Sequence, residues 1–323
     1  MPSLDESKDR YRGIFIAAPV PMKDDYALDL PKIEACIARL VDAGVGCGNA
    51  LYCVCGAGGE HMHLTVEERK AVAEASVRFA GGRLPVFVGI SHPSTAVSVD
   101  LARHAESIGA DGLQVEPPYY FHGTSDDVFE YFRAISESVA IGLTAYNTPW
   151  TSGFDMDRRF IDRLAGLENV IGLKWYSANF SEFVYVLRHY QRRFNIVSNL
   201  VGGFLASVFI LGAKGYVSQG ANFAPRTHLR ILNLVREKKY EEATDLYLRS
   251  EGVYYASVGE LVKQGINGEG NFIKACMPLI GVPCGPARPP HRTPPSWFVE
   301  QVRAALESVG ELASSHAGLR GEL

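Results

Sequence analysis

The chain has 323 residues, of which 47% are hydrophobic and 21% charged, and its formal net charge is -4. This composition suits one large globular domain, and the small negative charge gives no indication of binding to nucleic acid or to an anionic membrane. No apolar run is long enough to span a bilayer, and the polar segment 1–10 lacks the apolar core of a signal peptide. We therefore expect a cytoplasmic protein whose six cysteines are reduced.

Strand-like and helix-like segments alternate through most of the chain. Short apolar runs predict eight strands, over 13–18, 47–55, 84–89, 112–115, 141–146, 170–174, 194–198 and 214–218. Helical spacing and a capping box at Thr65 predict intervening helices over 29–43, 65–79, 95–108, 125–139, 157–164, 180–190 and 200–211. The pattern predicts an α/β fold, a (β/α)8 TIM barrel. A doubly wound sheet is the alternative, but the glycine fingerprint that often follows its first strand is absent.

No strand signal follows residue 224. Helices are predicted over 227–237, 240–257, 259–264 and 297–308, and the Pro/Gly-rich stretch 281–295 is expected to be irregular. We therefore divide the chain into an N-terminal segment (1–12), the barrel (13–224), a C-terminal helical region (225–312) and a tail (313–323) that we expect to be mobile.

Lys174 ends the sixth predicted strand, directly after the apolar residues 170–173. Burial lowers the pKa of an amine and makes it a nucleophile toward carbonyl groups. From this segment alone, a lysine that reaches water along its own stem is the simpler explanation. The fifth strand changes this balance because it ends in Tyr146 and Asn147. Neighbouring parallel strands would bring Tyr146 and Lys174 to the same rim of the barrel.

The active site of such a barrel lies at the carboxyl ends of its strands. Ala57, Gly58 and Gly59 follow the second strand in a loop whose backbone N–H groups can hold a carboxylate, although a plain tight turn is equally consistent. Glu60 is expected to be a structural partner of this loop, and His61 and His63 lack a third metal ligand, so no metal is expected. The other candidate substrate-binding residues at this rim are Asn147, Trp150, Thr151, Trp175, Asn199, Ser218 and Gln219.

Four motifs together resemble the dihydrodipicolinate synthase / N-acetylneuraminate lyase family. They are Gly56-Ala-Gly-Gly-Glu60, Pro118-Tyr-Tyr120, Tyr146-Asn-Thr-Pro149 and Gly172-Leu-Lys174, and Gly285-Pro-Ala-Arg-Pro-Pro290 also looks like a C-terminal segment of that family. The resemblance implies that Lys174 forms a Schiff base with pyruvate or another 2-oxo acid, without a further cofactor. It also implies that Tyr146 relays protons, that Tyr120 completes the relay across a subunit interface of a homotetramer, and that the glycine loop holds the substrate carboxylate.

Three departures from the family argue against lysine biosynthesis. Ala57 and Gly58 stand where the synthases have adjacent threonines, and Thr151 stands where they carry an arginine that grips a second carboxylate. A neutral side chain cannot supply that bidentate contact. The residues after the lysine, Trp175 and Tyr176, are also unusual. With Tyr52 and Trp150 they are candidates for an aromatic wall, which favours an apolar or aromatic substrate tail.

We therefore expect a Schiff-base lyase or aldolase, for example a hydratase-aldolase, that is not a true dihydrodipicolinate synthase. Two alternatives stay open. One is a dehydratase of deoxy-sugar acids, and the other is a barrel that has lost turnover and serves in binding or regulation. The missing threonines favour the last alternative, whereas the retained Tyr146 and Lys174 oppose it.

Overall fold

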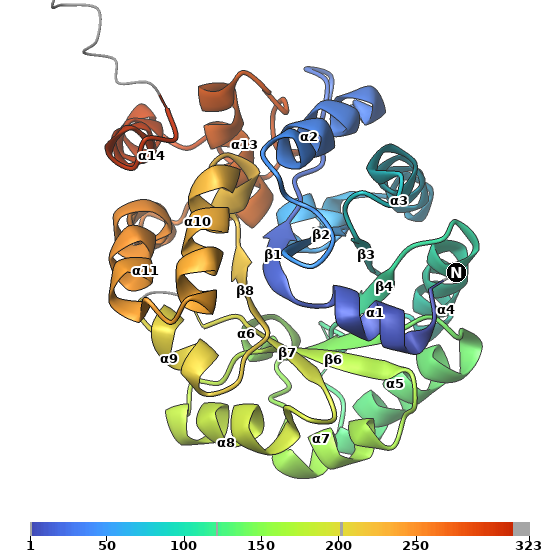
Figure 1. Cartoon of the computed structure of the whole chain (residues 1–323). Coiled ribbons are helices and arrows are strands. Elements are labelled where there is room, and N and C mark those ends of the chain that lie inside the picture. Colours follow the sequence, from blue (N-terminus) through green and yellow to red (C-terminus); the bar gives the residue numbers. More distant parts are fainter. Residues whose placement is uncertain (1, 121, 201–202, 313–323) are drawn as a thin grey trace, which may run out of the picture.

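The computed structural model describes residues 2–120, 122–200 and 203–312 and shows a closed barrel (Figure 1). Its parallel strands pair in chain order, and β1 pairs with both β2 and β8. The strands are β1 (Gly13–Ala17), β2 (Ala50–Val54), β3 (Val86–Gly89), β4 (Gly112–Val115), β5 (Leu143–Tyr146), β6 (Val170–Trp175), β7 (Asn195–Ser198) and β8 (Gly215–Ser218). The predicted TIM barrel is confirmed, with each strand within a few residues of its expected range.

Helices surround the barrel and bury their apolar faces against it (Figure 1). Those of the barrel are α2 (Leu30–Asp42), α3 (Val66–Ala80), α4 (Thr95–Ser107), α5 (Ser125–Ser138), α7 (Arg158–Ala165), α8 (Phe180–Tyr190), α9 (Leu205–Ile210) and α10 (Pro225–Arg236). The capping box predicted for α3 is present, because the Thr65 hydroxyl accepts from the Glu68 N–H at 3.2 Å and the Glu68 carboxylate accepts from the Thr65 N–H at 2.9 Å. A short helix, α6 (Pro149–Ser152), was not predicted.

The N-terminal segment forms helix α1 (Leu4–Arg10), which the polar sequence did not indicate. Tyr11 follows it and is fully buried, with its ring 5.4 Å from the ring of Phe87 and 6.3 Å from that of Phe15. A side chain at Gly172 would collide with the Tyr11 ring. Tyr11, Phe15 and Phe87 belong to the cluster that fills the barrel interior. Tyr11 therefore closes the amino-terminal end of the barrel.

The C-terminal region packs as helices beside α2 and α10, around a second apolar core (Figure 1). Its elements are α11 (Tyr240–Tyr247), the π-helical turn η4 (Leu248–Gly252), α12 (Val253–Lys263), α13 (Glu269–Cys276) and α14 (Ser296–Ser308). The predicted helix boundary near 258 is wrong, since α12 runs through Gly259, and α13 was missed. The stretch 281–295 contains no helix or strand after the short turn η5 (Met277–Ile280), as predicted.

Arg288 fastens this irregular stretch to α3 through two hydrogen bonds to Glu68, at 2.6 and 2.8 Å. The tail, 313–323, lies outside the described residues. Within the described part of the chain, no helix combines the length and the apolar character needed to cross a membrane.

Candidate active site

Lys174 lies near the carboxyl end of β6 with its side chain inside the barrel. Its Nζ is 3.8 Å from the centroid of the Tyr146 ring and 4.4 Å from that of the Phe15 ring, and the residue is only 6% exposed. Within the described ranges, this amine makes no hydrogen bond and no ion pair. Burial lowers the pKa of Lys174, while the nearby carboxyl groups of Glu269 and Glu116 oppose that shift. Burial thus favours the neutral, nucleophilic amine.

Tyr146 is held beside Lys174 by the pairing of their strands. The two residues are register partners in the β5–β6 ladder, so they emerge at the same rim, as predicted. The Asn199 Nδ2 donates to the Tyr146 hydroxyl oxygen at 2.9 Å. That contact leaves the phenolic proton free to be donated toward the pocket, because the hydroxyl serves as an acceptor in it.

A pocket of about 380 Å³ opens above Lys174. Its wall is aromatic on one side, where the Trp150 ring stands edge-on to the Tyr176 ring at 4.9 Å and to the Tyr146 ring at 6.1 Å between centroids. The lining residues are Tyr146, Trp150, Lys174, Tyr176, Asn199, Val217, Gln219, Tyr255 and Glu269. Of the residues predicted for the site, Lys174, Tyr146, Trp150, Asn199 and Gln219 therefore meet in one pocket.

The glycine loop forms a 3-10 turn, η1 (Ala57–Gly59), after β2. The Gly59 N–H is used inside the turn, since it donates to the Gly56 carbonyl at 3.0 Å. By contrast, the N–H groups of Ala57 and Gly58 make no hydrogen bond to any other residue that the structure describes. Gly58 is tightly packed, because a Cβ there would lie 3.1 Å from that of Ala17. A carboxylate at this loop would thus rest on the donors of Ala57 and Gly58.

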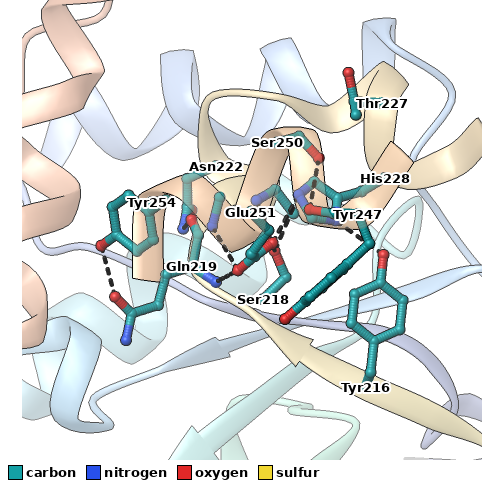
Figure 2. Close-up of polar contacts among 12 residues, drawn as sticks. Tyr216, Ser218, Gln219, Asn222, Thr227, His228, Tyr247, Ser250, Glu251 and Tyr254 are labelled. Atoms are coloured by element: carbon teal, nitrogen blue, oxygen red, sulfur yellow. Dashed lines mark hydrogen bonds and ion pairs between the residues drawn. The ribbon is translucent and has the colours of Figure 1, made fainter. Parts of the chain in front are cut away.

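Two predicted contact residues, Trp175 and Ser218, face away from the barrel interior. Trp175 is 1% exposed and packs in the core between the strands and the surrounding helices. The Ser218 hydroxyl donates to the Glu251 carboxylate at 2.5 Å, outside the barrel (Figure 2). The prediction that these two line the pocket is wrong, because neighbouring residues of a strand point to opposite faces and Lys174 and Val217 occupy the inner one. Tyr52 also lies in the outer core.

Asn147 and Thr151 are used by the loop after β5 rather than by the pocket. The Asn147 Nδ2 donates to the Asp155 carboxylate at 2.7 Å and to the Tyr176 carbonyl at 2.8 Å, and its Oδ1 accepts from the Met156 N–H at 3.0 Å. The exposed Thr151 donates its hydroxyl proton to the Thr148 carbonyl at 3.1 Å. The structure thus corrects their role from contact with substrate to support of the loop that carries Trp150.

Tyr120 lies on the loop after β4 and is 80% exposed. Its backbone φ is 83°, in the left-handed region that non-glycine residues rarely adopt. Within one subunit it does not line the pocket of Lys174. Its role across a subunit interface stays a prediction.

The two lysines that are buried among the described residues differ in their partners. Lys274 of α13 forms an ion pair with Glu60, at the end of the glycine loop, and its Nζ also donates to the Pro286 carbonyl at 3.1 Å. Glu60 is therefore structural, as expected, and it fixes the loop to α13. Lys174 has no such partner among the described residues, and an unpaired buried amine is costly unless it has a chemical role.

Two carboxyl groups near Lys174 were not assigned a role from the sequence. Glu116 follows β4, is 6% exposed, and has a pKa that burial raises to about 7. Glu269 begins α13 and lines the pocket itself. The flanking glycines, Gly268 and Gly270, were the available signal for Glu269, because they mark a close backbone approach. No group of three or more His, Cys, Asp or Glu residues suited to a metal ion occurs within the described ranges.

The model of the dihydrodipicolinate synthetase family matches residues 10–308. The chain is 34% identical to the 4-hydroxy-tetrahydrodipicolinate synthase of Hyphomonas neptunium over 67% of this chain and 72% of that protein. It is 31% identical to the enzyme of the same name from Clostridium novyi, over 74% and 78%. The fold also matches E. coli YagE in complex with pyruvate, with a TM-score of 0.81, 24% identity and coverage of 94% and 99%.

Proposed function

The chain belongs to the dihydrodipicolinate synthetase family and is a lyase of the class I aldolase type, and we propose that it acts on 2-oxo acids with an apolar or aromatic tail through a Schiff base on Lys174. The observation that carries the proposal is the unpaired amine of Lys174, buried at the base of a pocket and in contact with the Tyr146 ring. Pyruvate, the ligand in the YagE structure, is the smallest compound of the class.

The proposed reaction begins when the neutral Lys174 amine attacks the ketone carbon and water leaves. The resulting iminium withdraws electrons from the adjacent carbon, so a bond at that carbon can form or break. Tyr146 supplies and recovers protons, and its hydroxyl is oriented by Asn199 at 2.9 Å. The N–H groups of Ala57 and Gly58 hold the carboxylate.

The remainder of the pocket favours an apolar tail. Trp150 and Tyr176 form an aromatic corner that a flat group can cover. Among the described residues that line the pocket there is no arginine and no second lysine, whereas Glu269 is one of them, so a second carboxylate on the substrate would be repelled rather than bound. Dihydrodipicolinate synthase activity, tested with pyruvate and aspartate semialdehyde, is therefore expected to be absent or very weak.

A deoxy-sugar-acid dehydratase is the second candidate, and the polar lining residues Asn199, Gln219 and Glu269 favour it because they can bind hydroxyl groups. A comparison of kcat/KM for a benzylidene-pyruvate and a deoxy-sugar acid separates the two. A non-catalytic barrel would show turnover of neither.

We also propose that the protein is a homotetramer in the cytoplasm. The exposed Tyr120, held in a left-handed backbone conformation, is consistent with a side chain that completes the site of a neighbouring subunit. The proposal includes no cofactor other than the covalent imine.

Borohydride trapping tests the imine directly. Wild-type protein is reduced in the presence of a panel of 2-oxo acids, and intact mass and peptide mapping locate the adduct. One adduct per subunit is expected on the peptide that holds Lys174, and none in Lys174→Ala. Lys263→Ala, at an exposed lysine of α12, is the matched control and should label fully. An adduct that persists in Lys174→Ala would contradict the proposal.

A further inference from the structure

A glycine stands on each side of Glu269 at the start of α13, and the structure leaves no room for a side chain at either position. Gly268 has a φ of 112°, and a Cβ on it would lie 2.5 Å from the ring of His291. A Cβ on Gly270 would lie 2.6 Å from the Gly58 carbonyl oxygen. The ion pair between Lys274 and Glu60 fastens the same helix to the same loop. The backbone of residue 269, between the two glycines, is therefore fixed in place beside the site.

Glu269 is the residue held there, and it lines the pocket with Lys174 and Tyr146. No ion pair to Glu269 occurs within the described ranges, so no salt bridge neutralises its carboxylate. Burial raises the pKa of Glu269, and the nearby Lys174 amine and Gln219 side chain oppose that shift. A half-buried carboxylate of this kind accepts a proton more readily than an exposed one does.

The amide of Gln219 has one orientation because of a buried phenol. The Tyr254 hydroxyl donates to the Gln219 Oε1 at 2.6 Å, and Tyr254 is 1% exposed (Figure 2). With its oxygen occupied in this way, the amide presents its Nε2 donor, rather than an acceptor, to the other groups that line the pocket. The orientation of the amide is thus set from the C-terminal helices.

The backbone at Gln219 is anchored by Glu251, which is buried and belongs to the π-helical turn η4. One Glu251 oxygen accepts from the N–H groups of Gln219 and Gly220 at 2.9 and 3.2 Å. The other accepts from Ser218 at 2.5 Å and lies 2.7 Å from His228 Nε2 (Figure 2). Turns of π-helix occur frequently at functional sites, and this one delivers a carboxylate to the end of β8.

From this geometry we propose that Glu269 is the general base that takes the proton of the C4 hydroxyl group when a 4-hydroxy-2-oxo acid is cleaved at this site. The inference rests on the proposed function, because it needs the iminium on Lys174. In the cleavage step the C4 hydroxyl gives its proton to the Glu269 carboxylate. The C3–C4 bond breaks, its electron pair moves to form the C2–C3 double bond of an enamine, and the iminium nitrogen becomes neutral. The tail leaves as an aldehyde, and no oxidant or reductant is needed.

Other titratable groups face this region, so a pH profile alone would not identify the base. Glu269 interacts electrostatically with Lys174, Tyr146 and Glu116 from the barrel and with Tyr254 and Tyr255 of α12. The test therefore separates imine formation from bond cleavage. Pyruvate has no C4 hydroxyl group, so the formation of its imine does not need the proposed base.

The probe is 4-hydroxy-4-phenyl-2-oxobutanoate, and its cleavage is followed by the release of pyruvate. Glu269→Gln is expected to lower kcat by about 10²- to 10⁴-fold, the usual contribution of a general base. Borohydride trapping with pyruvate should still reach one adduct per subunit in this variant. Glu269→Ala should regain part of its kcat with added formate, which a structural role would not allow. Glu260→Gln, at an exposed carboxylate of α12, is the matched control.

Every other outcome overturns the inference, and each outcome identifies which part of it fails. A higher KM with unchanged kcat in Glu269→Gln would make the carboxylate a binding group only. Loss of trapping together with loss of cleavage would make it a support for Lys174, and Glu269→Asp, which keeps the charge, would then label normally. Trapping of pyruvate without cleavage of the probe by the wild type would remove the substrate class and leave the imine intact. No trapping in the wild type would overturn the proposed function itself.

Discussion

Replacement of Glu116 by glutamine should stabilise the protein above neutral pH. Glu116 is 6% exposed and its pKa is raised by burial from 4.5 to about 7. The folded protein thus binds this proton more tightly than the unfolded chain does. Below pH 4.5 the carboxyl is neutral in both states and has no cost. Above pH 7 it is ionised in the folded protein, and a shift of this size corresponds to a cost of about 3 kcal/mol.

Glu116→Gln removes this cost because the amide stays neutral at every pH. The gain in free energy of unfolding over the wild type should be small at pH 5 and should approach about 3 kcal/mol at pH 8, since stability falls as the pH rises from 4.5 through 7. Denaturant unfolding of both proteins at the two pH values measures it, with Glu34→Gln as the control for loss of one exposed carboxylate. Burial lowers the pKa of His61 to about 4, but His61 contributes equally to the wild type and to the variant, so its effect cancels in the difference.

The same gain at both pH values would refute this reasoning, because it would have no link to ionisation. A wild type more stable than Glu116→Gln at pH 8 would refute it more strongly. That result would mean that the ionised Glu116 is a net stabilising partner of Lys174, whose charge opposes the rise in the pKa of Glu116.

Three further predictions concern the pairing, the pocket wall and the assembly. Lys274→Met should destabilise the protein by about 3–5 kcal/mol in denaturant unfolding, because it leaves the buried Glu60 without its partner. The double change with Glu60→Gln should recover part of this loss, and an equal or larger loss would contradict the pairing. Trp150→Ala should lower kcat/KM for an aryl 2-oxo acid about 3- to 10-fold, in line with the loss of aromatic contact, and should leave pyruvate trapping unchanged; equal effects on both would count against the aromatic wall. Light scattering should give a mass of four 35.3-kDa chains. Mixed oligomers of Tyr120→Phe and Lys174→Ala subunits should regain activity, and a fully active monomer would exclude a shared site.

The fold could be predicted from the sequence because it depends on local patterns. Apolar runs of strand length, each followed by residues at helical spacing, specify the βα unit wherever it occurs. The same order places residues 146 and 174 at neighbouring strand ends, and the β5–β6 register confirms it. The capping box at Thr65 is equally local and is also present.

Local patterns could not determine which side chains of a strand point into the barrel and which point outward. Trp175 and Ser218 adjoin Lys174 and Gln219 in the chain, yet they lie in the outer core and against Glu251. A shift of one residue in a strand reverses its faces, and only the closed barrel decides which face is inside. Asn147 likewise has the composition of a binding residue, but its amide is used within its own loop.

By itself the sequence determined the barrel, the lysine and tyrosine at its rim, and the glycine loop beside them, because each lies at the end of a strand that its own residues define. Only the tertiary structure brought Glu269 into the pocket, since that residue is 95 positions from Lys174 in a region without strands. Its place depends on the close contact of α13 with the glycine loop and on the ion pair of Lys274 with Glu60. Contacts between segments so far apart in the chain leave no periodic signal, because they are set by packing and not by local spacing.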